Sequence, residues 1–117
     1  MENVCDLAVR ALDELLDYQE YPIEAARRST MNRRPLGVGI INFAYWLAKN
    51  GTTYQEPDLE MVDTWTEAWS YYLIKASNDL AKEKGACPKS NETKYGQGIT
   101  PNQTYKTDLD ELVKHQE

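Results

Sequence analysis

The most apolar stretch of the chain runs from Leu36 to Ala48, where hydrophobic residues follow one another almost without interruption. From Ile40 to Ala48 only Asn42 is polar, so a helix there is apolar on nearly every face. This pattern is typical of a segment packed on all sides. At 13 residues the stretch is too short to cross a bilayer, which takes about 20. We therefore predict a central element that needs protein neighbours all round.

The N-terminal residues, from Val4 to about Tyr18, predict an amphipathic helix, because apolar residues recur every three or four positions. Its apolar stripe consists of Val4, Leu7, Ala8, Ala11, Leu12 and Leu15. The charged residues opposite are Asp6, Arg10, Asp13 and Asp17. The carboxylates between residues 13 and 24 raise the alternative of a metal site. A solvated acidic face is favoured over it, since the Glu-x-x-His spacing of di-iron bundles is absent.

Proline marks the boundaries of the next elements. Pro22 ends the first helix, and a short helix over 23–31 follows. Pro35 biases Arg34 towards extended geometry, and the β-branched residues after it predict a short strand near 36–38 that leads into a helix over 41–50. If that strand finds no partner, it takes no regular structure. The fold expected for this chain is thus mainly α, with about four helices and at most one short strand.

Gly51 is predicted to stop the central helix in a left-handed conformation. Pro57 suits the first turn of a long helix that ends near Lys84 and is closed by Gly85. The apolar positions of this helix are Val62, Trp65, Trp69, Tyr72, Leu73, Ala76 and Leu80. Its aromatic residues fit either a stacking platform for a ligand or a core, and the regular spacing favours the core. A loop-rich stretch over 86–107 and a short helix over 108–116 complete the prediction.

The net charge of −6 argues against binding to nucleic acid or to an anionic membrane, which needs clustered basic residues. One local basic cluster exists, at Arg27, Arg28, Arg33 and Arg34. It fits either a phosphate clamp or ion pairs with nearby carboxylates, and the abundance of acidic residues favours ion pairs. Gly37 and Gly39 begin a dinucleotide-type pattern, but Asn42 replaces its third glycine. Close backbone approach is the better explanation of these glycines.

Cys5 and Cys87 are far apart in the sequence and fit neither a disulfide framework nor a zinc site. Two unpaired thiols suggest a reducing compartment. No charged-then-apolar leader is visible, so we expect a cytoplasmic protein and treat the sequons at Asn50, Asn91 and Asn102 as chance. A nucleophile, base and orienting group cannot be assembled around the single histidine, His115. We therefore assign no catalytic, cofactor-binding or metal-ligating residue.

Four segments of the chain, in order and spacing, resemble a known family. They read LAVRALDELLDYQEYP, RRPLGVGIINFAYWLAKNG, YYLIKASNDLAKEKGACP and NETKYGQGITPNQTYKTDLD. The chain is similar to the large, catalytic subunit of class I ribonucleotide reductase, most of all to bacterial and phage forms. The resemblance implies a slice of a ten-stranded α/β barrel that reduces ribonucleoside diphosphates to deoxyribonucleotides for DNA synthesis, with a thiyl radical delivered by a small metal-containing subunit.

The resemblance also implies that the catalytic machinery lies outside this chain, because the radical cysteine, the reducing cysteine pair and the substrate diphosphate loop belong to other parts of the family sequence. Cys5, Cys87 and the pair Tyr71 and Tyr72 match no catalytic position. We expect residues 1–117 to be a single partial domain, inactive alone, whose partners are the remaining parts of the large subunit and, through them, the small subunit. The alternative is a free-standing helical module that exposes Phe43, Tyr45 and Trp46 to another protein.

Overall fold

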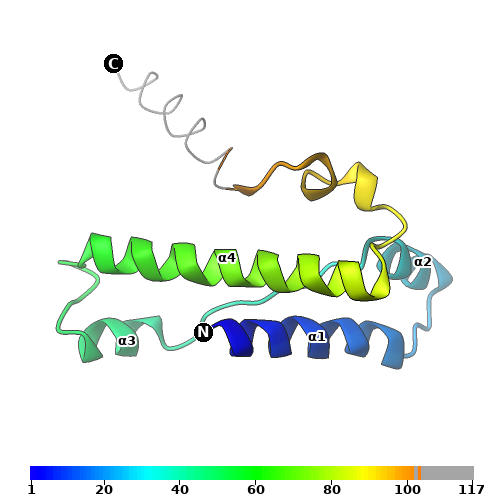
Figure 1. Cartoon of the computed structure of the whole chain (residues 1–117). Coiled ribbons are helices and arrows are strands. Elements are labelled where there is room, and N and C mark those ends of the chain that lie inside the picture. Colours follow the sequence, from blue (N-terminus) through cyan, green and yellow to red (C-terminus); the bar gives the residue numbers. More distant parts are fainter. Residues whose placement is uncertain (102, 104–117) are drawn as a thin grey trace, which may run out of the picture.

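The computed structural model describes residues 1–101 and 103, and helices form its framework (Figure 1). The α-helices are α1 (Glu2–Tyr18), α2 (Glu24–Arg33), α3 (Phe43–Lys49) and α4 (Leu59–Lys84), and the 3-10 helices are η1 (Ser90–Glu92) and η2 (Tyr95–Gln97). The described residues contain no β-strand. The prediction of a mainly α chain with four helices is confirmed within this range, while the helix predicted over 108–116 lies outside it.

The helix ends follow local chemistry, with small shifts from the predicted boundaries. At the start of α4, the side chain of Asp58 accepts a hydrogen bond from the Met61 N–H, 3.0 Å away, and so caps the helix. Pro57 therefore precedes the cap, and the prediction that it lies in the first turn is wrong. Gly85, at φ 92°, closes α4, and Gly51, at φ 75°, follows α3 in the left-handed region, both as predicted.

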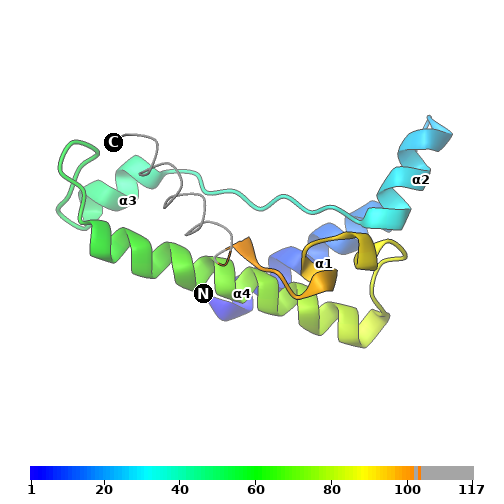
Figure 2. The same cartoon turned by 90° about the horizontal axis from the view of Figure 1, so that it is seen from above.

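Helices α1 and α4 lie side by side and run in the same direction (Figure 1). Two ion pairs fix this parallel register. Lys75 contacts Glu2 at 3.1 Å, and further along both helices Glu83 contacts Arg10 at 2.8 Å. The chain between them returns through α2, an extended segment and α3. Seen from above, the extended segment runs back along the pair from α2 to α3, opposite to both long helices (Figure 2).

The hydrophobic core is small and lies where α1, α4 and the extended segment meet. Val9, Ala76 and Leu80 are buried there, and Leu36 and Leu73 pack against them half-buried. Leu80 and Ala76 lie on the predicted stripe of α4, so that stripe is confirmed in part. The core is open on several sides, because the described part of the chain has too few elements to enclose it.

The side of α1 that packs against α4 differs from the predicted one. Its buried residues are Cys5, Val9 and Asp13. Most of the apolar stripe inferred from the sequence instead faces outward, with Val4, Leu7 and Leu15 exposed to 70%, 68% and 53%, while its members Ala8 and Leu12 are half-buried. Helix α4 covers the border between the apolar and polar halves of α1 rather than the middle of the apolar half. At this border charged side chains of α1 form ion pairs with α4.

Helix α3 packs on the N-terminal part of α4 through aromatic rings. The centroids of the Trp46 and Trp65 rings lie 5.3 Å apart, and those of the stacked Trp65 and Trp69 rings lie 6.2 Å apart. Phe43 stacks on Trp46 at 5.7 Å. All these rings are half-buried, which supports a packing role for them rather than a ligand platform. Leu47 beside them is only 1% exposed and is the best-covered side chain of α3.

The central stretch is not enclosed on all sides within the described structure. Ile41 and Tyr45 are 87% and 67% exposed, and Ala44 and Ala48 are also exposed. After α4 the chain folds back towards the end of α2, where the Lys89 N–H donates to the Asn32 carbonyl at 2.9 Å. No helix in the described residues has the length and apolarity that membrane crossing requires.

Candidate functional site

The extended segment over residues 35–41 has the geometry of a strand without a sheet. Among the described residues, none of its backbone N–H or C=O groups has a backbone hydrogen bond. Burial alternates over residues 35–39, where Leu36 and Val38 are half-buried while Pro35, Gly37 and Gly39 are exposed; Ile40, at 39% exposed, ends the alternation. Alternation with period two is the mark of a strand with one covered face. The strand predicted near 36–38 therefore takes its extended shape, but the described chain supplies no partner to pair with it.

One face of this segment is covered by the helices, and the rest is open. Leu36 packs against Val9, Ala76 and Leu80 of the α1 and α4 pair. A Cβ atom added at Gly37 or Gly39 would meet no other atom within 4 Å, so the close backbone approach predicted at these glycines is not made within the described structure. The edge of a strand that has no neighbour presents a row of unpaired N–H and C=O groups that can pair with another strand. The open edges of the segment are consequently the most conspicuous incomplete feature of the described structure.

The segment begins at a backbone turn on Arg34, which ends α2. Arg34 has φ 44° and ψ 55°, in the left-handed region, and its N–H donates to the Thr30 carbonyl at 2.6 Å. The prediction that Pro35 holds Arg34 in extended geometry is therefore wrong. A left-handed conformation costs a non-glycine residue about 1–2 kcal/mol. The contacts of the Arg34 side chain supply the compensating interactions.

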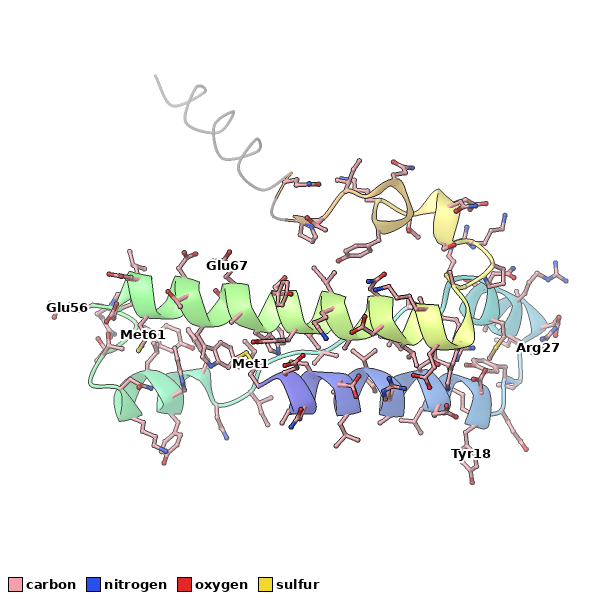
Figure 3. The ribbon with its side chains drawn as sticks, in the orientation of Figure 1. Met1, Tyr18, Arg27, Glu56, Met61 and Glu67 are labelled. Atoms are coloured by element: carbon pink, nitrogen blue, oxygen red, sulfur yellow. The ribbon has the colours of Figure 1, made fainter. Side chains whose placement is uncertain are left out.

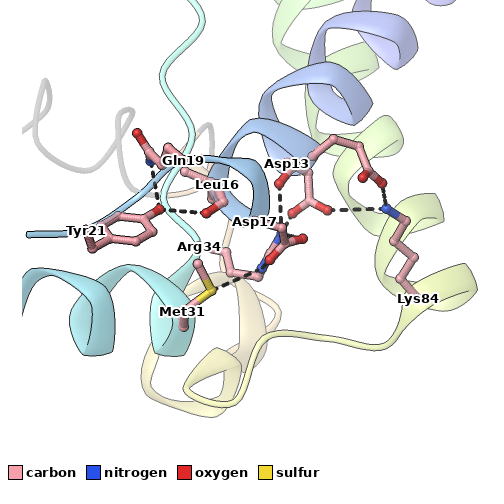
Figure 4. A network of polar contacts seen from close by, with 9 residues as sticks. Asp13, Leu16, Asp17, Gln19, Tyr21, Met31, Arg34 and Lys84 are labelled. Atoms are coloured by element: carbon pink, nitrogen blue, oxygen red, sulfur yellow. Dashed lines mark hydrogen bonds and ion pairs between the residues drawn. The ribbon is translucent and has the colours of Figure 1, made fainter. Parts of the chain in front are cut away.

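The Arg34 guanidinium binds two carboxylates of α1 (Figure 4). Its Nε donates to Asp13 Oδ1 at 2.8 Å, and its two Nη atoms donate to Asp17 Oδ1 and Oδ2, each at 2.8 Å. Nη2 also donates to the Asp13 backbone carbonyl at 2.8 Å, and Nη1 approaches the Met31 sulfur at 3.8 Å. Fork-shaped contacts of this kind are the strong class of charged hydrogen bonds. They fasten the start of the extended segment to α1.

Burial strengthens this network. The Asp13 side chain is 12% exposed and that of Arg34 is 21% exposed. Hydrogen bonds from Arg34 lower the pKa of Asp17, and those to Asp17 and Asp13 raise the pKa of Arg34. Lys84, from the end of α4, pairs with Glu14 and lies 3.7 Å from Asp13 (Figure 4). The prediction of a fully solvated acidic face on α1 is thus wrong at Asp13, which joins three elements.

Two further arginines of the basic cluster, Arg27 and Arg33, also pair with carboxylates. Arg27 forms a two-pronged contact with Glu24 at 2.7 and 2.8 Å, and Figure 3 shows it at the outer end of α2. Arg33 contacts Glu92 at 3.3 Å. These contacts confirm the ion-pair interpretation for Arg27, Arg33 and Arg34, and they point the guanidinium groups to different carboxylates rather than to a shared phosphate. Sequence reasoning identified the type of contact but missed its partners, because Asp13 and Asp17 lie 21 and 17 residues from Arg34.

The other candidate features do not form a chemical centre among the described residues. The described residues gather no group of three or more His, Cys, Asp or Glu side chains able to hold a metal ion. Cys5 and Cys87 are free thiols, with Cys5 buried, and His115 lies outside the described residues. The surface expected of a free-standing module is also incomplete: Tyr45 is exposed, whereas Phe43 and Trp46 are half-buried in the aromatic packing.

Comparison with known sequences decides the family. The pattern of the ribonucleotide reductase barrel domain matches residues 1–117. The chain belongs to this family. It is 61% identical over 99 residues to the ribonucleoside-diphosphate reductase 1 subunit alpha of Salmonella typhimurium, covering 84% of this chain and 13% of that protein. The alpha subunit of Haemophilus influenzae is 56% identical over 92% of this chain, and that of Enterobacteria phage T4 is 39% identical over 97%.

The chain spans about one seventh of these relatives, with 14% of the Haemophilus and 15% of the phage protein covered. Membership confirms the resemblance to bacterial and phage ribonucleotide reductase large subunits. The geometry of the site agrees with this membership. In an α/β barrel, helices of the outer layer run parallel to one another and opposite to the strands they cover. Helices α1 and α4 and the segment over 35–41 have these directions in the described structure (Figure 2).

Proposed function

We propose that residues 1–117 form part of the barrel wall in the large subunit of a ribonucleoside-diphosphate reductase, as a single partial domain. The observation that carries this proposal is the extended segment over 35–41, which lies against α1 and α4 with no backbone hydrogen bond in the described structure. A strand covered on one face by parallel helices fits between two further strands. Neighbouring strands of the barrel would complete the hydrogen bonds at both edges.

In this role the chain contributes scaffold, while the catalytic cysteines and the substrate diphosphate loop come from the rest of the large subunit. The assembled enzyme reduces ribonucleoside diphosphates to deoxyribonucleotides, with a small radical-generating subunit as the second partner. The free state of Cys5 and Cys87 supports a reducing, cytoplasmic location. The names of the relatives, all reductase alpha subunits, support the substrate class.

A chimera tests the proposal directly. The alpha subunit of Escherichia coli is 58% identical to this chain over 99 residues. Replacing that aligned stretch by the corresponding stretch of this chain gives a full-length subunit with its own catalytic residues. We expect the chimera to fold, to bind the Escherichia coli small subunit and to retain at least about a tenth of the parental turnover of a ribonucleoside diphosphate, because the replaced stretch holds only scaffold.

The parental subunit is the positive control, and a chimera carrying the same residues in scrambled order is the negative control. A folded chimera without diphosphate reduction shows that this chain lacks something the wall must supply. Failure of the chimera to fold, while the parent folds, shows that the chain does not fit the barrel. Either result contradicts the proposed function.

A further inference from the structure

Helix α3 ends at the pair Asn50 and Gly51, the only place in the chain where glycine follows asparagine. Both residues are exposed, where the chain leaves α3 for the loop that leads into α4 (Figure 1). The side-chain amide of an asparagine reacts with the backbone nitrogen of the next residue, and this reaction is fastest when that residue is glycine, which has no side chain to hinder it. Asn50 is therefore the asparagine of this chain with the greatest intrinsic tendency to deamidate.

The reaction replaces the side-chain amide by a carboxylate and needs only water. The Gly51 nitrogen loses its proton to the solvent and attacks the side-chain carbon Cγ of Asn50. The Cγ–Nδ2 bond breaks, and Nδ2 takes up a proton and leaves as ammonia, so that a five-membered cyclic imide remains. Water then opens the imide at one of its two carbonyls and gives aspartate or isoaspartate. One water is consumed and one ammonia is released, and nothing is oxidised or reduced.

The last turn of α3 holds the two reacting groups apart. Nδ2 of Asn50 donates to the Trp46 carbonyl at 2.8 Å, so the side chain reaches back along the helix. The Gly51 N–H donates to the Ala48 carbonyl at 3.0 Å, which opposes the loss of its proton. With ψ at 13°, the Asn50 backbone turns the Gly51 nitrogen away from the side chain. Ring closure therefore requires a rotation about ψ and the loss of both hydrogen bonds.

Leu47 anchors this turn to the rest of the molecule. Its side chain is 1% exposed, and its carbonyl accepts hydrogen bonds from the Asn50 N–H and the Thr52 N–H, each at 3.0 Å. Opening the turn thus breaks several hydrogen bonds and disturbs a buried side chain. Local opening of this kind costs free energy, so only a minor fraction of the molecules is open at any time.

We propose that Asn50 is a modification site of this chain, at which deamidation proceeds only while the last turn of α3 is open. The inference does not depend on the proposed function, because the reacting groups and the turn that restrains them belong to the chain itself. The product weakens the end of α3. A carboxylate has no N–H to donate to the Trp46 carbonyl, and its negative charge lies at the negative end of the helix dipole.

Ageing of the whole chain in mildly alkaline buffer tests the site and its restraint. Native and urea-unfolded samples are followed by peptide mass spectrometry and by an isoaspartyl methyltransferase assay. We expect Asn50 to deamidate in both, at least about tenfold more slowly in the native sample, as for a turn open a tenth of the time. Asn91, exposed but followed by Glu92, is the internal control and stays largely unmodified. Asn50→Gln abolishes the product, because its longer side chain forms a less favourable ring.

Matched substitutions in α3 test whether the turn is the restraint, and both leave the reacting pair unchanged. Leu47→Ala removes the buried anchor, whereas Tyr45→Ala shortens a side chain that is 67% exposed. We expect the first to speed native deamidation by at least about threefold, because large-to-small changes at buried sites destabilise the folded state. The second is expected to change the rate by less than about twofold. The native and urea comparison of the parent chain remains decisive if Leu47→Ala does not fold.

Three results would overturn the inference. Equal rates in the native and urea-unfolded parent would show that the turn gives no protection. Equal native rates for folded Leu47→Ala and Tyr45→Ala would show that protection comes from elsewhere. Reaction of Asn91 as fast as that of Asn50 would remove the assignment of the site. The barrel-wall role stands or falls separately, with the chimera.

Discussion

The contact between α1 and α4 and the extended segment over 35–41 differ in how far each is complete. The helix contact needs no further backbone partner: it buries Val9 and Leu80, and ion pairs join its two helices. The segment is covered on one face, but its backbone groups are unpaired within the described structure. The difference follows from backbone chemistry, since a helix satisfies its own hydrogen bonds and a strand depends on its neighbours. A slice of an α/β barrel therefore keeps its helices and loses its sheet.

The largest expected effect comes from blocking the strand edge. Val38→Pro removes one backbone donor that has no partner in the described chain but would pair in a barrel. In the chimera we expect loss of most diphosphate-reducing activity, because proline inside a sheet removes a ladder hydrogen bond and is tolerated only on edge strands or at bulges. Helix content of the isolated chain, measured by circular dichroism, stays unchanged. Val38→Thr keeps the N–H and the β-branched shape and serves as the control. Full activity of the proline variant would show that this edge is not paired.

The helix contact is tested at its best-buried leucine. Leu80 is 6% exposed, and Leu80→Ala is expected to destabilise the isolated chain by about 2–3 kcal/mol, near the lower end for buried leucines because the core is open. Leu59, 71% exposed, provides the control, and Leu59→Ala is expected to change the unfolding free energy by less than about 0.5 kcal/mol. Urea unfolding measures both. Similar losses for the two variants would mean that the α1 and α4 contact is not the stable part.

The connection between the two regions is tested at Arg34. Removing its partly buried contacts by Arg34→Ala is expected to cost about 3 kcal/mol, since Asp13 then keeps only the longer contact with Lys84, at 3.7 Å. Arg34→Gly loses the same contacts but relieves the left-handed backbone at φ 44°, so it is expected to be about 1 kcal/mol more stable than the alanine variant. Urea unfolding of both variants separates the side-chain contribution from the backbone one. A glycine variant less stable than the alanine variant would contradict this division.

The smallest effect is the pH dependence of Asp17. Hydrogen bonds from Arg34 depress its pKa in the folded state, so the stability it contributes is present above the unfolded pKa of about 3.9 and is lost as pH falls through the folded pKa. We expect Asp17→Asn to be less stable than the parent at pH 5 and the gap to narrow by pH 3. Because Asp17 is half exposed, the change is below about 1 kcal/mol. A gap that widens with acid would have the wrong sign.

Several elements of the fold could be predicted from the sequence because they depend on local chemistry. The end of α4 follows from Gly85, and the strand-like alternation of Leu36 and Val38 follows from period two. The buried side of α1 could not be predicted from the apolar pattern, because most of the apolar residues of α1 lie on a face that the described chain leaves exposed. The contacts of Arg34 were equally out of reach, since they depend on a left-handed turn that Pro35 disfavours and that distant carboxylates stabilise.

Hydrogen exchange of the backbone amides at residues 36–41 tests the central claim most directly. Measured by mass spectrometry in the isolated chain and in the full-length chimera, it reports whether these N–H groups are bonded. The account predicts exchange at the rate of an unstructured peptide in the isolated chain, where no backbone partner is present, and strong protection in the chimera. Equal exchange in both proteins, whether fast or slow, would contradict the claim that this strand is completed by the rest of the barrel.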